Sequence, residues 1–167
     1  MNWDAISAVG EIVGASVVFI SLFYVGFQVR ENSRAVRGQT YQSLCTTIAE
    51  QATLTSTDPE LSLLWLKFAR EEAFSEVEEA RFLAAVNASV RLATAVHYQF
   101  SLGLLNAQQL QELTGTPQAL LASPIGQRFW DATKAHRSKA FVTFMEGAMA
   151  SQSSAADIKQ AWTQGDA

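Results

Sequence analysis

ISAVGEIVGASVVFISLFYVGFQV, residues 6–29, is the stretch that decides the fold. No charged residue occurs between Ile12 and Val29, and Arg30 closes the run. A helix needs about 20 apolar residues to cross a bilayer core of about 30 Å. We therefore predict that residues 6–29 form one transmembrane helix.

Two alternatives to a membrane anchor are a signal peptide and a buried helix of a soluble protein. A signal peptide begins with basic residues and ends at a small-residue cleavage site. Residues 1–4 read MNWD, without lysine or arginine, and no convincing cleavage site follows. A retained anchor is therefore favoured, and the buried helix remains as the alternative.

The charges that flank the uncharged run predict its orientation. Asp4 and Glu11 precede the run, whereas Arg30, Arg34 and Arg37 follow it. Cytoplasmic flanks of membrane helices are enriched in lysine and arginine. We expect residues 1–5 to form a short external N-terminus and the chain after the span to lie in the cytoplasm.

The composition limits the class of protein. The net charge of −4 and the pI near 5.1 argue against a nucleic-acid partner, which needs a basic face. A mean hydropathy of +0.07 excludes a protein with many spans. Cys45 is the only cysteine, which excludes an intramolecular disulfide and agrees with a cytoplasmic domain.

The remainder of the chain is predicted to be an all-α bundle of about five helices. No segment keeps the two-residue alternation of a strand. The expected parts are a juxtamembrane helix over 30–56, a cytoplasmic helical domain over 57–149, and a polar, loosely ordered tail over 150–167. The juxtamembrane helix continues the span, with a bend or break expected between Asn32 and Gly38.

Capping residues predict the helix boundaries in the cytoplasmic domain. The expected N-caps are Thr57 with Glu60, Ser75 with Glu78, Asn106 with Gln109, and Ser123 before Pro124. The expected helix ends are Gly103 and Gly115. The longest helix, about 76–102, carries a core stripe formed by Leu83, Val86, Val90, Ala93, His97 and Phe100.

One face of the predicted span carries small or polar side chains at alternating spacings of three and four. We call this set the small-residue seam: Ser7, Gly10, Gly14, Val17, Ser21, Tyr24 and Gln28. Helices in lipid associate through small residues and interhelical hydrogen bonds. The seam predicts a transmembrane interface, for self-association or for docking on a larger membrane complex. The alternative is that glycine and serine are simply common in spanning helices.

Glu11 flanks the seam and is a candidate intramembrane ionisable site. A carboxylate at the bilayer centre costs about 2.5–3.5 kcal/mol on insertion scales. If the hydrocarbon core begins near residue 6, Glu11 needs a proton or a partner; if it begins near residue 10, Glu11 stays hydrated. The open alternatives are an interfacial or paired glutamate and a proton or cation site within an oligomer.

Arg91, His97 and Tyr98 form a candidate ligand pocket on the longest helix. The alternatives are a structural core role for His97 and, for the polar stripe with Arg91 and Tyr98, a solvated surface, a polar contact with neighbouring helices or a bound anion. No nucleophile elbow, phosphate-cradling glycine loop or metal-ligand spacing occurs in the sequence. We therefore expect no catalytic residues, no cofactor, no metal site and no enzymatic activity.

The N-terminal region resembles that of a group of small uncharacterised bacterial membrane proteins. The matching residues are Trp3, Gly10-Glu11, Gly14-Ala15, Tyr24, Gln28, Arg30 and Asn32. Weaker similarity extends to Tyr98, Gln99, Gly103, Leu104, Trp130 and Phe141. The resemblance implies a bacterial inner-membrane protein with a single span and a helical cytoplasmic domain, and it implies no activity.

These observations predict a membrane-anchored interaction or scaffold protein without enzymatic activity. Its expected partners are the lipid bilayer and, through the transmembrane helix, a second copy or another membrane protein. A membrane-bound sensor with a ligand pocket in the cytoplasmic helices is the alternative. A proton- or ion-linked oligomer that depends on Glu11 is a third hypothesis.

Overall fold

The computed structural model describes the backbone of residues 3–151 and the side chains of Glu11 and residues 14–150. This part of the chain contains six α-helices and one short 3-10 helix and no strand. The prediction of an all-α protein is confirmed. Most of the predicted tail, residues 152–167, lies outside the described residues.

The first helix, α1, is continuous from Trp3 to Thr57. It covers both the predicted span and the predicted juxtamembrane helix, so the break expected between Asn32 and Gly38 was wrong. Gly38 costs a helix only about 1 kcal/mol, and no proline stands in this region. Local bonds such as Ser33 Oγ to the Val29 carbonyl, 2.8 Å, also suit an unbroken helix.

The chain divides into two compact units, residues 1–40 and residues 41–167. The described part of the first unit is a single helical segment of α1. Over the described residues, no helix is both long enough and apolar enough to cross a membrane. The span predicted for residues 6–29 is therefore not confirmed.

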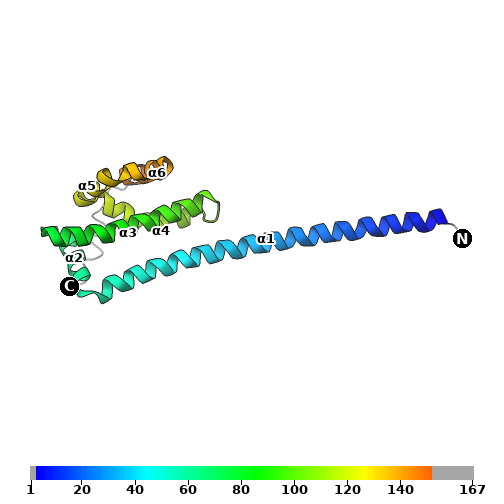
Figure 1. The fold of residues 1–167 in the computed structure, drawn as a ribbon, viewed down its shortest axis with the longest axis horizontal. Coiled ribbons are helices and arrows are strands. Elements are labelled where there is room, and N and C mark those ends of the chain that lie inside the picture. The colour runs from blue at the N-terminus through cyan, green and yellow to red at the C-terminus, as the bar shows by residue number, and fades with distance from the viewer. Residues whose placement is uncertain (1–2, 152–167) are drawn as a thin grey trace. The chain divides into compact units, whose positions relative to one another are not determined.

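The second unit contains the end of α1 and a bundle of five further α-helices. The bounds are α2 Pro59–Ala69, α3 Glu76–Ser101, α4 Ala107–Ala122, α5 Pro124–Thr133, the 3-10 helix η1 Lys134–His136, and α6 Lys139–Ser151. Helices α3 and α4 lie side by side, α2 packs on α3, and α5 and α6 pack on α4 (Figure 1). Helix α3 is the longest of these five, as the sequence predicted.

Several predicted boundaries are confirmed by their hydrogen bonds. Capping boxes form at Ser75 with Glu78 and at Asn106 with Gln109. The Ser123 hydroxyl caps α5, and Gly103 ends α3 with a φ of +70°, which suits glycine. Glu78 also binds Lys67 of α2 at 2.7 Å; the Lys67 ammonium and the Ser75 cap lower the pKa of Glu78 to about 2.

The N-cap of α2 differs from the prediction. Thr57 is the last residue of α1, and its hydroxyl donates back to the Thr53 carbonyl at 2.8 Å. Asp58 is the cap instead, and its carboxylate accepts from the Glu60 and Leu61 amides at 2.9 and 3.2 Å. Helices α1 and α2 are therefore separated by one residue. Asp58 is the better cap, because the Thr57 hydroxyl already donates a hydrogen bond within α1.

Helix α4 also differs from the prediction, because it continues through Gly115 and Pro117 to Ala122. An internal proline disfavours a helix by about 3 kcal/mol. Burial of residues 117–121 in the second half of α4 opposes this cost. The buried Thr114 hydroxyl donates to the Leu110 carbonyl at 2.6 Å, and the buried Gln118 amide donates to Thr114 at 3.0 Å, so these polar groups are satisfied inside the core.

The core of the bundle has two neighbouring clusters. The larger one gathers Leu64, Phe68, Phe82, Val86, Val90, Ala93, Leu120, Leu121, Trp130, Phe141 and Met145. The smaller one gathers Val96, Leu105, Leu110 and Leu113. Tyr41, Leu44, Cys45 and Ile48 of α1 pack on the smaller cluster, which makes this part of α1 a member of the second unit.

The junction of α4 and α5 has space for no side chain at position 126. A Cβ added to Gly126 would lie 2.7 Å from the Leu121 Cα, and backbone atoms cannot yield easily. We predict that Gly126→Ala lowers the free energy of unfolding by about 1–3 kcal/mol, as other overpacking changes do.

Gly147 of α6 provides the matched control, because an added Cβ there meets no atom within 4 Å. Gly147→Ala should raise the free energy of unfolding by up to about 1 kcal/mol, since alanine favours a helix. The two variants can be compared by chemical denaturation followed by circular dichroism. Equal effects of the two changes would contradict the close approach at Gly126.

Candidate functional site

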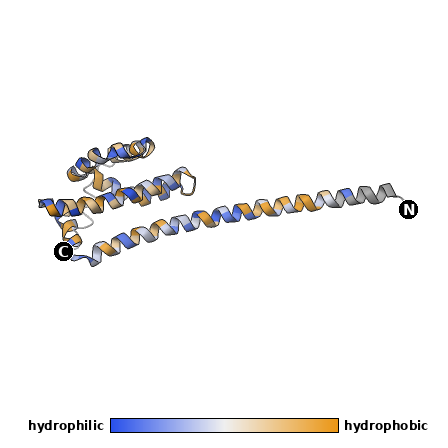
Figure 2. Ribbon diagram, in the orientation of Figure 1, coloured by the Kyte–Doolittle hydropathy of each residue, from blue (hydrophilic) through white to orange (hydrophobic). Residues whose placement is uncertain are grey.

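The first candidate site is an apolar surface on the part of α1 that belongs to the first unit. We call it the apolar girdle. It consists of Val17, Val18, Phe19, Ile20, Leu22, Phe23, Tyr24, Val25, Phe27 and Val29, all exposed. Figure 2 shows this segment as a nearly unbroken apolar part of the helix. Successive residues turn by about 100° around a helix, so these side chains cover every side of it.

Such a surface is not stable in water. A helix that is apolar all round is normally buried, and large exposed apolar patches mark sites of protein or membrane contact. Within the first unit, the described residues supply no other element that covers the girdle. Exposed apolar surface of this kind is typical of a segment that contacts a membrane or another protein.

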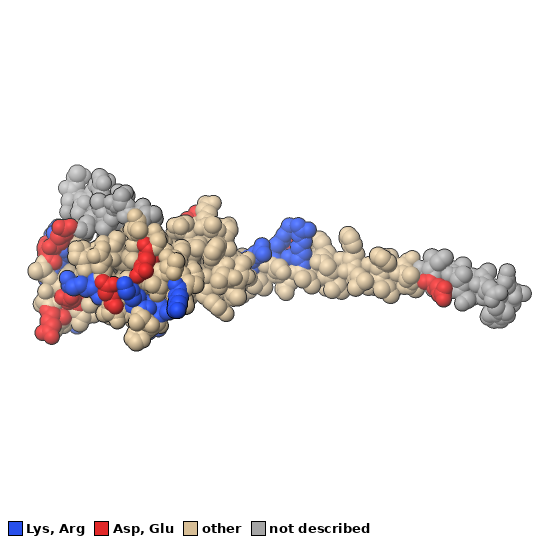
Figure 3. All heavy atoms as spheres, turned by 90° about the horizontal axis from the view of Figure 1, so that it is seen from above, with Lys and Arg blue, Asp and Glu red and all other residues tan. Residues whose placement is uncertain are grey.

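Three exposed arginines follow the girdle on α1: Arg30, Arg34 and Arg37. Figure 3 shows basic side chains gathered next to the uncharged stretch of this helix. Arg34 pairs with Glu31 at 2.8 Å, but both side chains are exposed, so the pair contributes little stability. The helix thus passes abruptly from apolar to basic.

Five residues of the small-residue seam have described side chains: Gly14, Val17, Ser21, Tyr24 and Gln28. Ser7 and Gly10 lie outside the described side chains. The Ser21 hydroxyl donates to the Val17 carbonyl at 2.8 Å, and the Gln28 amide donates to the Tyr24 hydroxyl at 2.9 Å. These contacts confirm that the residues share a face, and they leave the Tyr24 hydroxyl proton for an external acceptor.

Glu11 is exposed and forms no ion pair with any residue that the structure describes. Among the described residues, no basic side chain forms an ion pair with the Glu11 carboxylate.

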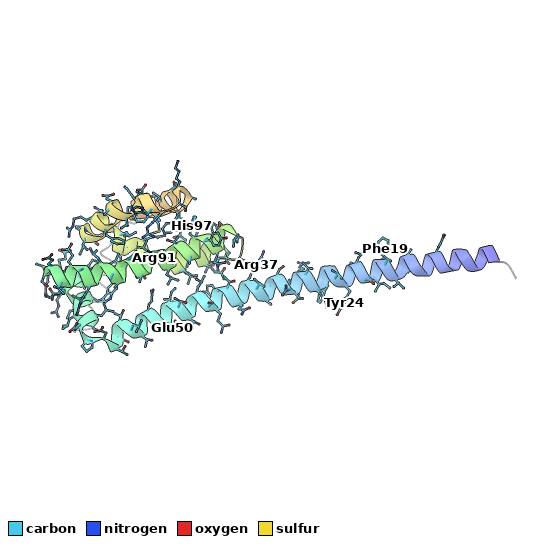
Figure 4. All side chains as sticks on the ribbon, viewed as in Figure 1. Phe19, Tyr24, Arg37, Glu50, Arg91 and His97 are labelled. Carbon is cyan, nitrogen blue, oxygen red and sulfur yellow. The ribbon has the colours of Figure 1, made fainter. Side chains whose placement is uncertain are left out.

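The three residues of the predicted ligand pocket do not converge. Arg91 and Tyr98 are exposed, whereas His97 is half-buried and packs between aromatic rings. Figure 4 labels Arg91 and His97 at separate positions in the bundle. The His97 ring lies 5.6 Å from that of Phe141 and 5.1 Å from that of Phe144. Burial lowers the pKa of His97, so the imidazole is neutral at pH 7. His97 is thus part of the packing of α3 on α6.

A cavity of about 790 Å³ lies elsewhere in the second unit, between the end of α1 and helices α2, α3 and α4. Its apolar walls are Ile48, Trp65, Leu92, Leu113 and Pro117. Neither Arg91, His97 nor Tyr98 lines it. The sequence did not indicate this cavity, because its walls come from four helices and no single segment carries a recognisable pattern.

Most of the hydroxyl groups that line this cavity donate a hydrogen bond to a backbone carbonyl of the chain. The Ser62 hydroxyl donates to the Thr55 carbonyl at 2.5 Å, and the Ser89 hydroxyl donates to the Ala85 carbonyl at 3.2 Å. Their oxygens remain as acceptors on walls that are chiefly apolar but that also include Gln51, Glu112 and Thr116. The cavity therefore suits an apolar molecule with few polar groups.

No group of three histidine, cysteine, aspartate or glutamate side chains is arranged for a metal ion among the described residues. No known protein family, curated protein or solved structure matches the chain. The candidate sites therefore depend on the geometry of this chain alone.

Gly14 offers a direct test of the seam. An added Cβ at Gly14 meets no atom of this chain within 4 Å, so a larger side chain there disturbs no internal packing. We predict that Gly14→Ile weakens association of the helix in membranes by about fivefold or more, because it prevents close approach of a second helix. Crosslinking in isolated membranes measures the effect.

Gly26 is the matched control, since it is equally open and lies on the opposite side of α1 from the seam. Gly26→Ile should leave association unchanged. Equal association in the Gly14 and Gly26 variants would refute the seam as an interface.

Proposed function

We propose that the protein is a membrane-anchored helical interaction protein without enzymatic activity. Its apolar girdle lies in a lipid bilayer, and its small-residue seam packs against a second copy or another membrane protein. The helical bundle is its cytoplasmic domain. The observation that carries this proposal is the exposure of large apolar side chains on every side of α1 between Val17 and Val29.

A lipid environment explains the girdle better than a single protein partner does. A coiled coil buries one stripe of each helix and leaves the other sides in water. The apolar side chains of the girdle lie on every side of the helix, including the seam face, where Val17 and Tyr24 stand beside Ser21 and Gln28. In the sequence the uncharged run extends from Ile12 to Val29, which is about 27 Å of helix and close to the thickness of a bilayer core.

The arginines after the girdle support an orientation. Arg30, Arg34 and Arg37 follow the apolar residues within the next eight residues of the helix. The positive-inside rule then favours the bundle in the cytoplasm and the residues before the girdle outside. The resemblance to small bacterial membrane proteins favours the bacterial inner membrane.

Ile20 and Leu22 test the proposal, because they are similar in size and lie on nearly opposite sides of α1. Their exposed fractions are 70% and 65%. We predict that Ile20→Asp and Leu22→Asp each reduce recovery in carbonate-washed membranes, since a carboxylate in a bilayer costs about 2.5–3.5 kcal/mol. The double variant should be largely lost from the membrane fraction.

The pattern of effects separates lipid from protein. A protein partner on one face would make the protein sensitive to only one of the two changes. Val77→Asp, an equally drastic change at an exposed position of the bundle, is the control and should leave membrane recovery unchanged. Full recovery of the double variant in washed membranes would refute the anchor.

A second candidate function is a membrane-bound sensor, and the cavity of about 790 Å³ favours it. The volume is in the range of small-molecule sites, and the walls are chiefly apolar. In this hypothesis an apolar ligand binds between α1 and the bundle. The site differs from the pocket predicted at Arg91, His97 and Tyr98.

A photoactivatable aliphatic diazirine tests the cavity in the full chain reconstituted in bicelles. We predict adducts on peptides that contain Trp65 and Leu92, in addition to adducts on the girdle, which serve as an internal positive control. Ser89→Phe should fill the cavity and reduce the adducts on the Trp65 and Leu92 peptides by severalfold. Ser101→Phe, a change at the exposed end of the same helix, should leave these adducts unchanged. Adducts confined to the girdle would exclude the ligand site.

A further inference from the structure

Two arginines of the bundle, the exposed Arg91 and the half-buried Arg137, form no ion pair with a carboxylate that the structure describes, and the exposed Lys139 likewise forms none. Most of the other cations of the bundle are paired. Lys67 pairs with Glu78, Arg81 with Glu60, and Arg128 with Glu79, and Lys134 bridges Asp131 and Glu146. Among the described residues, neither Arg91 nor Arg137 forms an ion pair. We call these two residues the arginine pair.

Arg137 stands in the short link between η1 and α6, and its side chain is held by packing. Its Cζ lies 5.7 Å from the centre of the Trp130 ring, within the range of a cation–π contact. Trp130 is buried, and its indole N–H donates to Glu146 Oε1 at 3.3 Å, so the ring has a defined orientation. The guanidinium of Arg137 therefore rests on a rigid surface.

Thr94 of α3 orients the same guanidinium from the other side. Its hydroxyl donates to the Val90 carbonyl at 2.8 Å, which leaves its oxygen to accept from Arg137 Nη1 at 3.3 Å. The Nε of Arg137 is buried and has no hydrogen-bond partner in the described part of the chain. Part of the donor capacity of this guanidinium is thus unused, which is costly for a charged group.

Arg91 stands one helical turn before Thr94 on α3, so its side chain shares the face on which Arg137 contacts Thr94. The two positive charges are close enough to interact. Burial and, after it, the charge of Arg91 lower the pKa of Arg137. The fold thus brings together two cations that repel each other, and the residues that the structure describes place no paired carboxylate between them.

We propose that the arginine pair binds a phosphate group, with Arg91 on the open side and Arg137 on the packed side. Guanidinium groups donate paired N–H bonds to phosphate oxygens, and two of them match its charge. A bound phosphate would reduce the repulsion within the pair and accept from Nη donors of Arg137 that Thr94 leaves free, whereas the buried Nε lies out of its reach. The group is carried by a soluble phosphorylated molecule or by the headgroup of an anionic phospholipid, which present the same chemistry.

The test uses the full chain in an uncharged detergent, with inorganic phosphate and glycerol phosphate as probes in titration calorimetry at constant ionic strength. Arg91→Gln should weaken binding by about tenfold or more, since a charge-assisted hydrogen bond is lost. Because Arg91 is exposed, this variant should fold like the wild type. Arg137→Gln should weaken binding at least as strongly.

Arg128→Gln is the matched control, because it removes the same charge from another exposed position of the bundle. It should change phosphate binding by less than about twofold. A second arm reconstitutes the chain in nanodiscs of phosphatidylcholine with a minor fraction of phosphatidic acid and measures the phosphatidic acid retained on purification. Retention that depends on Arg91, without binding of the free probes, would support the proposal and identify a lipid headgroup as the source.

Two results would overturn the proposal. One is the absence of both saturable binding of the probes and retention of phosphatidic acid. The other is equal weakening by Arg128→Gln and Arg91→Gln, which would show only non-specific attraction to a positive surface.

Discussion

The folded domain depends on the burial of one face of α3. Phe82, Val86, Val90, Ala93 and Val96 are at most 1% exposed, and they meet side chains from every other helix of the bundle. Full burial of each large apolar side chain contributes about 1.5–3 kcal/mol. Phe82 is the centre of this contact, since its ring stacks on Phe68 and Phe74 at 5.0 and 5.1 Å. Polar residues on the remaining faces of α3 are then free for other contacts, and Thr94 and Arg91 stand there beside Arg137.

Both units of the chain carry large apolar side chains that are unfavourable in water, but the two units differ in what covers these side chains. The bundle covers its apolar residues with its own helices. A single helix cannot cover a girdle of large apolar side chains that surrounds it, so the first unit needs an external environment. This contrast makes the girdle a surface of contact rather than a core, and it connects the proposed anchor with the arginines that follow. The cavity and the arginine pair lie in the second unit and are independent of that proposal.

Much of the fold was predictable because it depends on local chemistry. The capping residues Ser75, Asn106 and Ser123 satisfy amides within one turn, and Gly103 adopts a φ that glycine accepts without strain. Predictions failed where burial outweighed local preference. Helix α4 passes through Gly115 and Pro117 because residues 117–121 are buried. The break expected in α1 failed for another reason, since the exposed Gly38 alone costs too little to interrupt the helix. The core stripe on α3 was predicted at Leu83 and His97, but the fully buried positions are the neighbouring Phe82 and Val96.

By itself the sequence determined the all-helical class, most helix boundaries, the uncharged run on α1 and the arginines after it. Each of these follows from residues within a few turns of one another, whose chemistry acts without the rest of the chain. Only the tertiary structure decided that His97 packs between aromatic rings, that a cavity opens among four helices, and that Arg137 reaches Thr94, 43 residues away. These features depend on which helix faces meet. That choice is made by the burial of apolar surface over the whole bundle, which no single segment specifies.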